Sequence, residues 1–205
     1  LLVEAGEPWD AVVAHAVGNG LAGIEALSGI PGSVGAAPIQ NIGAYGQELS
    51  SSLVAIDFLD FGSGEVEHLA ASELGLGYRT SALKNGRLGV VLGIELALAA
   101  SPDGLSQPIA YDQLAKAMGV DLGARVALSE VRAAVIALRA SKGMVLDAAD
   151  PDSVSAGSFF TNPIVSENFA RRLPSDAPRW PTEPERPPEV LPMGTPIPVA
   201  HASGE

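Results

Sequence analysis

The order of apolar and polar positions in the first third of the chain predicts short strands and one helix. Residues 1–5 form a largely apolar run that predicts a strand. In residues 8–17, between a proline and two glycines, apolar side chains recur at helical spacing, which predicts a helix. Residues 53–61 and 66–69 flank the turn sequence GSG and predict a β-hairpin.

The middle of the chain adds one strand and two helices to this prediction. Residues 89–98 are continuously apolar and predict a strand, whereas the sequence AYDQL predicts a helix that begins near Tyr111. Ser129 is expected to cap a further helix that runs to Ser141, with three side chains facing the core: Val131, Val135 and Leu138. Strands and helices mix without a βαβ rhythm, so the predicted fold class is α+β.

The pattern changes in the last third of the chain. Residues 142–151 are polar and rich in turn formers, which favours a boundary between two domains, 1–145 and 146–205. From 174 to 198, nine of 25 residues are proline, so this segment is expected to be an extended surface loop or disordered.

Charge and cysteine content exclude several classes of protein. The 12 basic and 24 acidic residues give a net charge of −12, which disfavours non-specific binding to nucleic acid or to an anionic membrane. The absence of cysteine excludes disulfides and thiolate metal sites and fits a cytoplasmic location. No signal peptide or membrane span is evident, and the first residue is leucine, so the chain is expected to be an internal piece of a longer protein.

A glycine-rich run, GIPGSVGAAPIQNIGAYG, occupies residues 29–46. Glycine permits positive φ and lets a backbone lie close to a neighbour, and successive free N–H groups can bind an anion. The spacing matches neither the G-x-G-x-x-G fingerprint nor a P-loop. Spacing alone therefore leaves two interpretations open, a tightly packed structural loop and a wall that binds a cofactor.

Three further sequences carry candidate chemistry, each with a structural alternative. GYRTSALK holds Arg79, which could bind a carboxylate or stabilise an oxyanion, or simply pair with a surface acid. Tyr111 would by default be a half-buried tyrosine. SAGSFFTNP holds Ser158 without the second glycine of a nucleophile elbow, and it could be an ordinary strand residue. We expect no metal site, because the histidines have no partners at ligand spacing: His15, His68 and His201.

Together these sequences resemble one family. SGIPGSVGAAPIQNIGAYG, GYRTSALK, RASKGMVLD and SAGSFFTNP occur in this order in UDP-N-acetylenolpyruvoylglucosamine reductases, the MurB family. The likeness extends over residues 1–168. Tyr111 and the GAYG sequence resemble the type I branch, and the proline-rich insertion resembles actinobacterial members.

The resemblance implies a fold and a reaction. It implies an FAD-binding domain of the vanillyl-alcohol-oxidase type, lacking its N-terminal lobe here, followed by the start of a smaller α+β substrate domain. It implies a UDP-N-acetylmuramate dehydrogenase, in which NADPH reduces the flavin and UDP-N-acetylglucosamine enolpyruvate is then reduced to UDP-N-acetylmuramate. The reductase is expected to be monomeric.

The resemblance also assigns roles to residues. It implies that Ser158 protonates the substrate carbon and that Arg79 stabilises the enolate-like intermediate. Other positions match substrate contacts: Tyr78, Tyr111, Lys142 and Asn162. Positions in the glycine-rich run match the wall along the flavin and its diphosphate: Ile30, Pro31, Gly32, Ser33, Gly35, Ala36, Ile39, Gly43, Ala44 and Tyr45.

Two family elements have no counterpart in the sequence, namely a GGGSN-type flavin loop and a C-terminal catalytic glutamate. The alternatives are therefore another FAD-dependent oxidoreductase of the same fold, or a folded remnant or interaction module without cofactor. The substrate-side sequence SAGSFFTNP argues against the first, and the missing flavin loop favours the second.

Overall fold

The computed structural model describes residues 1–155, 157 and 161–179. The chain divides into two compact units, Leu1–Thr161 and Asn162–Glu205. In the described part of the second unit, α4 (Glu167–Ala170) begins where the Ser166 hydroxyl accepts a hydrogen bond from the Phe169 N–H. The predicted domains 1–145 and 146–205 stay a prediction, and most of the predicted proline-rich loop lies outside the described residues.

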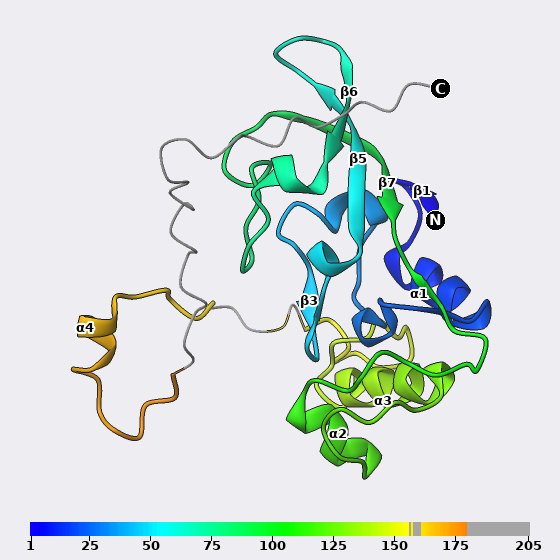
Figure 1. Cartoon of the computed structure of the whole chain (residues 1–205), viewed down its shortest axis with the longest axis vertical. Coiled ribbons are helices and arrows are strands. Elements are labelled where there is room, and N and C mark those ends of the chain that lie inside the picture. The colour runs from blue at the N-terminus through cyan, green and yellow to red at the C-terminus, as the bar shows by residue number, and fades with distance from the viewer. Residues whose placement is uncertain (156, 158–160, 180–205) are drawn as a thin grey trace, which may run out of the picture. The chain divides into compact units, whose positions relative to one another are not determined.

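A four-stranded antiparallel sheet forms the body of the first unit (Figure 1). Its strand order is β1 (Leu2–Glu4), β7 (Gly89–Leu96), β5 (Leu53–Asp60) and β6 (Val66–Ala70). All four strands and the β5–β6 hairpin were predicted by the sequence pattern and are confirmed.

Helices and shorter elements complete the first unit. Helix α1 (Trp9–Gly18) confirms the predicted N-terminal helix, and α2 (Asp112–Met118) begins after Tyr111 as expected. The remaining elements are two small ladders, α3 and four 3₁₀ turns: β2 (Leu21–Ala22) with β8 (Ala99–Ala100), β3 (Gly43–Ala44) with β4 (Gln47–Glu48), α3 (Leu128–Ala140), η1 (Glu25–Leu27), η2 (Val34–Ala36), η3 (Leu49–Ser51) and η4 (Ala71–Leu74).

Two apolar clusters hold these elements together. The larger one joins the sheet to α1 and includes Trp9 and Phe58, each 1% exposed. The Trp9 indole N–H donates to the Leu27 carbonyl over 3.0 Å, which satisfies its polar atom inside the core. The smaller cluster packs α2 against α3 around Leu114 and Val135. The fold is thus α+β, as predicted.

The predicted cap of α3 is wrong. The helix begins at Leu128, and its N-cap is Ala127, which has no side-chain cap hydrogen bond. Leu128 is 3% exposed, and its N–H donates to the Gly104 carbonyl over 2.9 Å. Tertiary packing of Leu128 therefore extends the helix past Ser129. Across the described ranges, no helix has both the length and the apolar composition to cross a bilayer.

Candidate functional site

The first residue of the glycine-rich run, Gly29, is held by side chains of α1 and α3, and we call this set of contacts the clamp. Gly29 has φ +69°; its N–H donates to Asp10 Oδ1 over 2.6 Å, and its carbonyl accepts from Arg139 Nε over 3.1 Å. Arg132 holds both Asp10 carboxylate oxygens, over 2.6 and 2.8 Å. This guanidinium lowers the pKa of Asp10, so the carboxylate stays ionised. The clamp fixes the run between α1 and α3.

Residues 29–36 form the N-terminal half of the glycine run. The Gly32 carbonyl accepts from the Trp9 N–H over 2.9 Å, while within the described chain the Gly32 and Ser33 N–H groups have no acceptor. A Cβ at Gly32 would meet no atom within 4 Å, whereas one at Gly35 would lie 2.7 Å from Ala5 Cβ. The backbone is therefore pressed at Gly35 against Ala5, the residue directly after β1, and is open at Gly32.

All ten residues predicted to face the cofactor are at least partly exposed. Between them Val34 and Ala37 are buried at 0% and 2%, and Ile42 at 8%. The 3₁₀ turn η2 produces this division, because it directs Val34 into the core and leaves its neighbours at the surface. The run thus has a core side and an accessible side.

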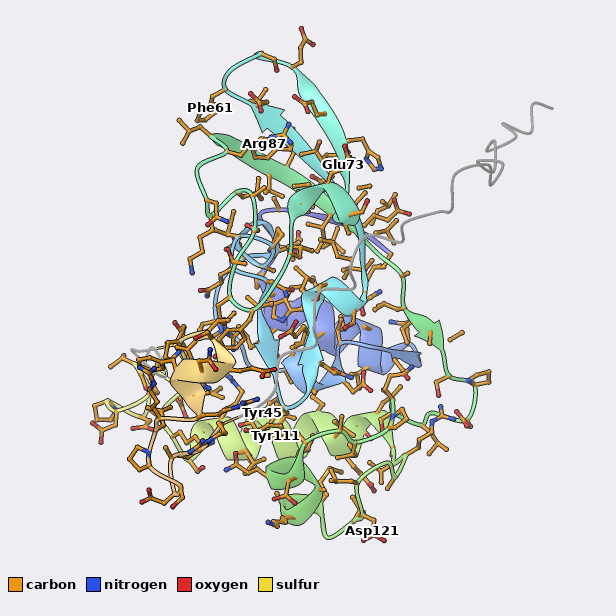
Figure 2. The ribbon with its side chains drawn as sticks, turned by 60° about the vertical axis from the view of Figure 1, so that its left-hand side comes forward. Tyr45, Phe61, Glu73, Arg87, Tyr111 and Asp121 are labelled. Carbon is orange, nitrogen blue, oxygen red and sulfur yellow. The ribbon has the colours of Figure 1, made fainter. Side chains whose placement is uncertain are left out.

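Residues 41–46 form the hairpin half of the glycine run, which ends in the β3–β4 hairpin. Its two-residue turn, Tyr45 and Gly46, has positive φ at both positions, +47° and +84°, as type I′ hairpin turns do. The Tyr45 ring meets the Tyr111 ring edge-on at a centroid distance of 5.8 Å. Figure 2 shows the two rings together between the hairpin and the start of α2. Burial raises the pKa of Tyr45.

Gly77–Thr80 form the arginine turn. Reciprocal backbone hydrogen bonds of 3.2 and 3.3 Å join its ends, and Arg79 lies within it at φ +54°. Arg79 Nη2 donates to the Gly43 carbonyl over 2.8 Å, and its own carbonyl accepts from Lys84 Nζ over 2.8 Å. In this contact the Arg79 guanidinium binds a backbone carbonyl, and not a surface carboxylate as the predicted alternative required.

Lys142 approaches the hairpin half from the loop after α3. Its ammonium lies 5.9 Å from the Tyr45 ring centroid and 3.2 Å from Gln113 Oε1 of α2. Residues predicted from four separate sequences thus contact one hairpin: Arg79 contacts it at Gly43, and Tyr111 and Lys142 contact it at Tyr45. Tyr78 lies beside them, with the Arg79 Cζ 5.8 Å from its ring centroid. Ser158 lies outside the described residues, and Asn162 belongs to the second unit.

Sequence reasoning missed two residues at this place. Asn41 is 1% exposed and has φ +46°, and Arg139 is 8% exposed. Burial lowers the pKa of Arg139. Asparagine is the non-glycine residue most often found at positive φ, so Asn41 in a glycine-rich run was a usable signal. No local pattern pointed to Arg139, because its partner Gly29 lies 110 residues away.

Comparisons with known proteins identify relatives of this chain. Residues 1–70 match the family described as an FAD binding domain. UDP-N-acetylenolpyruvoylglucosamine reductase of Leifsonia xyli is 68% identical over 200 residues, which cover 95% of this chain and 53% of the relative. The chain belongs to the UDP-N-acetylenolpyruvoylglucosamine reductase family. The enzyme of that name from Salinispora arenicola is 50% identical over 185 residues, 87% of this chain and 50% of the relative.

The chain spans about half the length of the curated relatives it matches. Both sources are actinobacteria, as the proline-rich segment predicted. The crystal structure of UDP-N-acetylenolpyruvylglucosamine reductase from Thermus caldophilus matches 68% of this chain and 43% of its own, with a TM-score of 0.50 and 28% identity. The expected fold is thus confirmed. The expected cofactor, FAD, is confirmed by the match of residues 1–70 to the FAD binding domain family.

Proposed function

We propose that this chain supplies the flavin wall and part of the substrate site of an NADPH-dependent reductase that converts UDP-N-acetylglucosamine enolpyruvate to UDP-N-acetylmuramate. The observation that carries the proposal is that Arg79, Tyr111 and Lys142 all contact the β3–β4 hairpin, Arg79 at Gly43 and the other two at Tyr45. These residues come from sequences far apart in the chain, and each was expected at a flavin or substrate site. A structural loop alone gives no reason for them to gather.

The residues present fit FAD. The N-terminal half of the glycine run offers two adjacent N–H groups without an acceptor in the described chain, at Gly32 and Ser33. Adjacent free amides of this kind suit a diphosphate. The accessible side of the run is uncharged from 30 to 46, so no carboxylate of the run itself opposes an anion there. FAD would supply hydride transfer when bound.

Arg79 is the residue we assign to charge stabilisation. Hydride addition to an enolpyruvyl group moves negative charge onto the substrate carboxylate, and a fixed guanidinium stabilises that charge more in the transition state than in the ground state. Its bond to the Gly43 carbonyl uses one of its donors and holds it in place, which leaves other N–H groups for a carboxylate.

Ser158 is the proposed proton donor to the substrate carbon. A serine hydroxyl is a weak acid, so it serves here only because the enolate is strongly basic and a neighbouring cation stabilises the alkoxide. Lys142 and Arg79 are both candidates for that cation. The proposed partners are UDP-N-acetylglucosamine enolpyruvate and NADPH, and the proposed setting is a cytoplasmic monomer.

The first experiment measures FAD binding by fluorescence quenching. It compares this chain with a full-length reductase that contains the same sequence. If only the full-length reductase binds FAD, the missing part of the cofactor site lies in the portion of the reductase outside this chain. Binding by neither would refute the flavoprotein assignment and leave the interaction module as the better description.

The second experiment tests the reaction by stopped flow in the full-length reductase. Ser158→Ala should spare reduction by NADPH and strongly slow the step that consumes the enolpyruvyl substrate. Ser175→Ala, at an exposed serine, is the control and should leave both rates unchanged. Equal loss of both rates in Ser158→Ala would contradict the proton-donor role.

A further inference from the structure

Backbone strain in the first unit is concentrated at the candidate site. Among the described residues, three that are not glycine have positive φ: Asn41 at +46°, Tyr45 at +47° and Arg79 at +54°. Such conformations persist only where the surroundings hold them, and they cluster at functional sites. Tyr45 and Arg79 already belong to the site. Asn41 is the third, and nothing so far gives it a role.

The Asn41 side chain is buried and fully engaged. Its Oδ1 accepts from the Ser50 N–H over 2.9 Å, and its Nδ2 donates to Glu48 Oε2 over 3.1 Å and to the Gly77 carbonyl over 3.0 Å. Both amide N–H groups are therefore used. The orientation of the amide follows from its partners, because a flipped amide would place its oxygen against two acceptors.

These bonds join the two loops that form the site. Glu48 belongs to β4 and Ser50 to η3, which follows the hairpin. Gly77 is the first residue of the arginine turn and lies 36 residues after Asn41. Two further contacts cross the same seam: Arg79 Nη2 to the Gly43 carbonyl, and the Ser81 hydroxyl to the Ile39 carbonyl over 2.6 Å. Ser81 is 0% exposed and Asn41 1%, but of the three bonds only the Asn41 bond holds a backbone group of the turn itself, the Gly77 carbonyl.

We propose that Asn41 is a positioning residue, which fixes the arginine turn against the hairpin and so aims Arg79 at the substrate. The proposal rests on the function proposed above for Arg79. In the folded protein, the amide sets where Gly77 lies, the reciprocal Gly77–Thr80 hydrogen bonds set the turn, and the turn sets the direction of the guanidinium. A displacement of about 1 Å at a reacting group can slow a reaction about 100-fold.

Two substitutions separate the amide from the backbone conformation. Asn41→Gly favours positive φ but removes the amide. Asn41→Asp keeps the acceptor for Ser50 but places oxygen against the Gly77 carbonyl and the Glu48 carboxylate. The matched control is Asn85→Asp, because Asn85 is exposed and only its oxygen, which accepts from Thr80 Oγ1, is engaged.

The first measurement is hydrogen exchange by mass spectrometry on this chain, and it needs no activity. In Asn41→Gly, we expect exchange of residues 77–84 to quicken at least tenfold while exchange of α3 stays unchanged. Asn85→Asp should match the unsubstituted chain. Unchanged exchange of 77–84 in Asn41→Gly, or faster exchange throughout the unit, would overturn the inference. Asn41→Gly decides the matter even if Asn41→Asp does not fold.

The second measurement uses the full-length reductase. Asn41→Gly should lower the rate of the enolpyruvyl step about tenfold to 100-fold, with the rate of reduction by NADPH and the KM for NADPH unchanged. Equal slowing of both steps would show a general structural role and overturn the proposal. If the unsubstituted reductase shows no enolpyruvyl reduction, the proposed function fails, and hydrogen exchange alone decides whether Asn41 holds the turn.

Discussion

The two halves of the glycine run differ in what lies against their backbone. In the N-terminal half, Gly29 is clamped and Gly35 is pressed against the residue after β1, but Gly32 faces open space between them. In the hairpin half, a Cβ at Gly43 would lie 3.0 Å from Glu48 Cγ and 3.6 Å from Arg79 Nη1, and one at Gly46 would lie 3.1 Å from Ala110 Cβ.

This difference explains why the run is rich in glycine. Each glycine of the run is required by the chain itself, either for close approach of another segment or for positive φ, and Gly32 has φ +115°. Gly32 differs from the others because it also combines open space with free amide groups on the described chain. The run is thus a structural loop, and the cofactor wall proposed for it would use the free amide groups at Gly32 and Ser33.

The largest expected effect belongs to the hairpin half. Arg79→Lys keeps the charge but loses the planar fork that lets one guanidinium hold the Gly43 carbonyl and a carboxylate together. In stopped flow on the full-length reductase, we expect the enolpyruvyl step to slow about 100-fold and reduction by NADPH to be unchanged. Arg87→Lys, on the β5–β6 side, is the control. Unchanged enolpyruvyl reduction would remove Arg79 from the site.

Next comes the packing of the N-terminal half against Ala5. Gly35→Ala places a methyl group 2.7 Å from Ala5 Cβ, so we expect the free energy of unfolding to fall by about 2 kcal/mol in urea titrations. Gly6→Ala, where an added Cβ meets nothing within 4 Å, should change stability by less than about 0.5 kcal/mol. Equal effects of the two substitutions would show that the approach to Ala5 is not tight.

A smaller effect is expected on the accessible side of the N-terminal half. Ala36 is exposed, and Ala36→Glu places a carboxylate beside the proposed diphosphate site. We expect FAD affinity to fall about tenfold by fluorescence titration, because two anions would share the site. Ala36→Gln adds similar bulk without charge and should bind as the unsubstituted protein does. Equal weakening by both variants would assign the loss to bulk rather than charge.

The smallest effect concerns the clamp at Gly29. Arg132 lowers the pKa of Asp10 below its ordinary value of about 4, so the ion pair stabilises the fold above that pH and is lost as pH falls through the lowered pKa. The Asp10 side chain is 41% exposed, so Asp10→Asn should cost about 0.5–1 kcal/mol at pH 7. This difference should shrink in urea titrations as pH falls through the lowered pKa of Asp10; a difference that stays constant as pH falls would mean that charge is not the cause.

The elements of the sheet were predictable because each has a local pattern. β1, β5 and β7 are largely apolar runs, β6 follows the turn sequence GSG of a hairpin, and the apolar side chains of α1 recur at helical spacing. The start of α3 was not predictable in the same way, because burial of Leu128 by distant residues extended the helix beyond the serine that local capping favours.

The site was predicted through resemblance rather than pattern. Arg79 and Tyr45 were assigned to a site by the resemblance, and that assignment stays a prediction; the contacts that hold them, to Gly43 and Tyr111, were not foreseen. Asn41 bonds to Gly77 across 36 residues, and Arg139 to Gly29 across 110 residues. A hydrogen bond from a side chain to a distant backbone carbonyl leaves no periodicity in the sequence, so these contacts required the structure.

The turn at Tyr45 carries a consequence for how the family can be engineered. A two-residue hairpin turn with positive φ at both positions favours asparagine, aspartate or glycine, yet this one begins with a tyrosine whose ring meets Tyr111. A residue better suited to the turn would make the hairpin more stable and remove the ring. With the role proposed for Tyr45 at the cofactor wall, stability and activity are opposed at this residue, and selection for thermostability alone would discard the aromatic side chain.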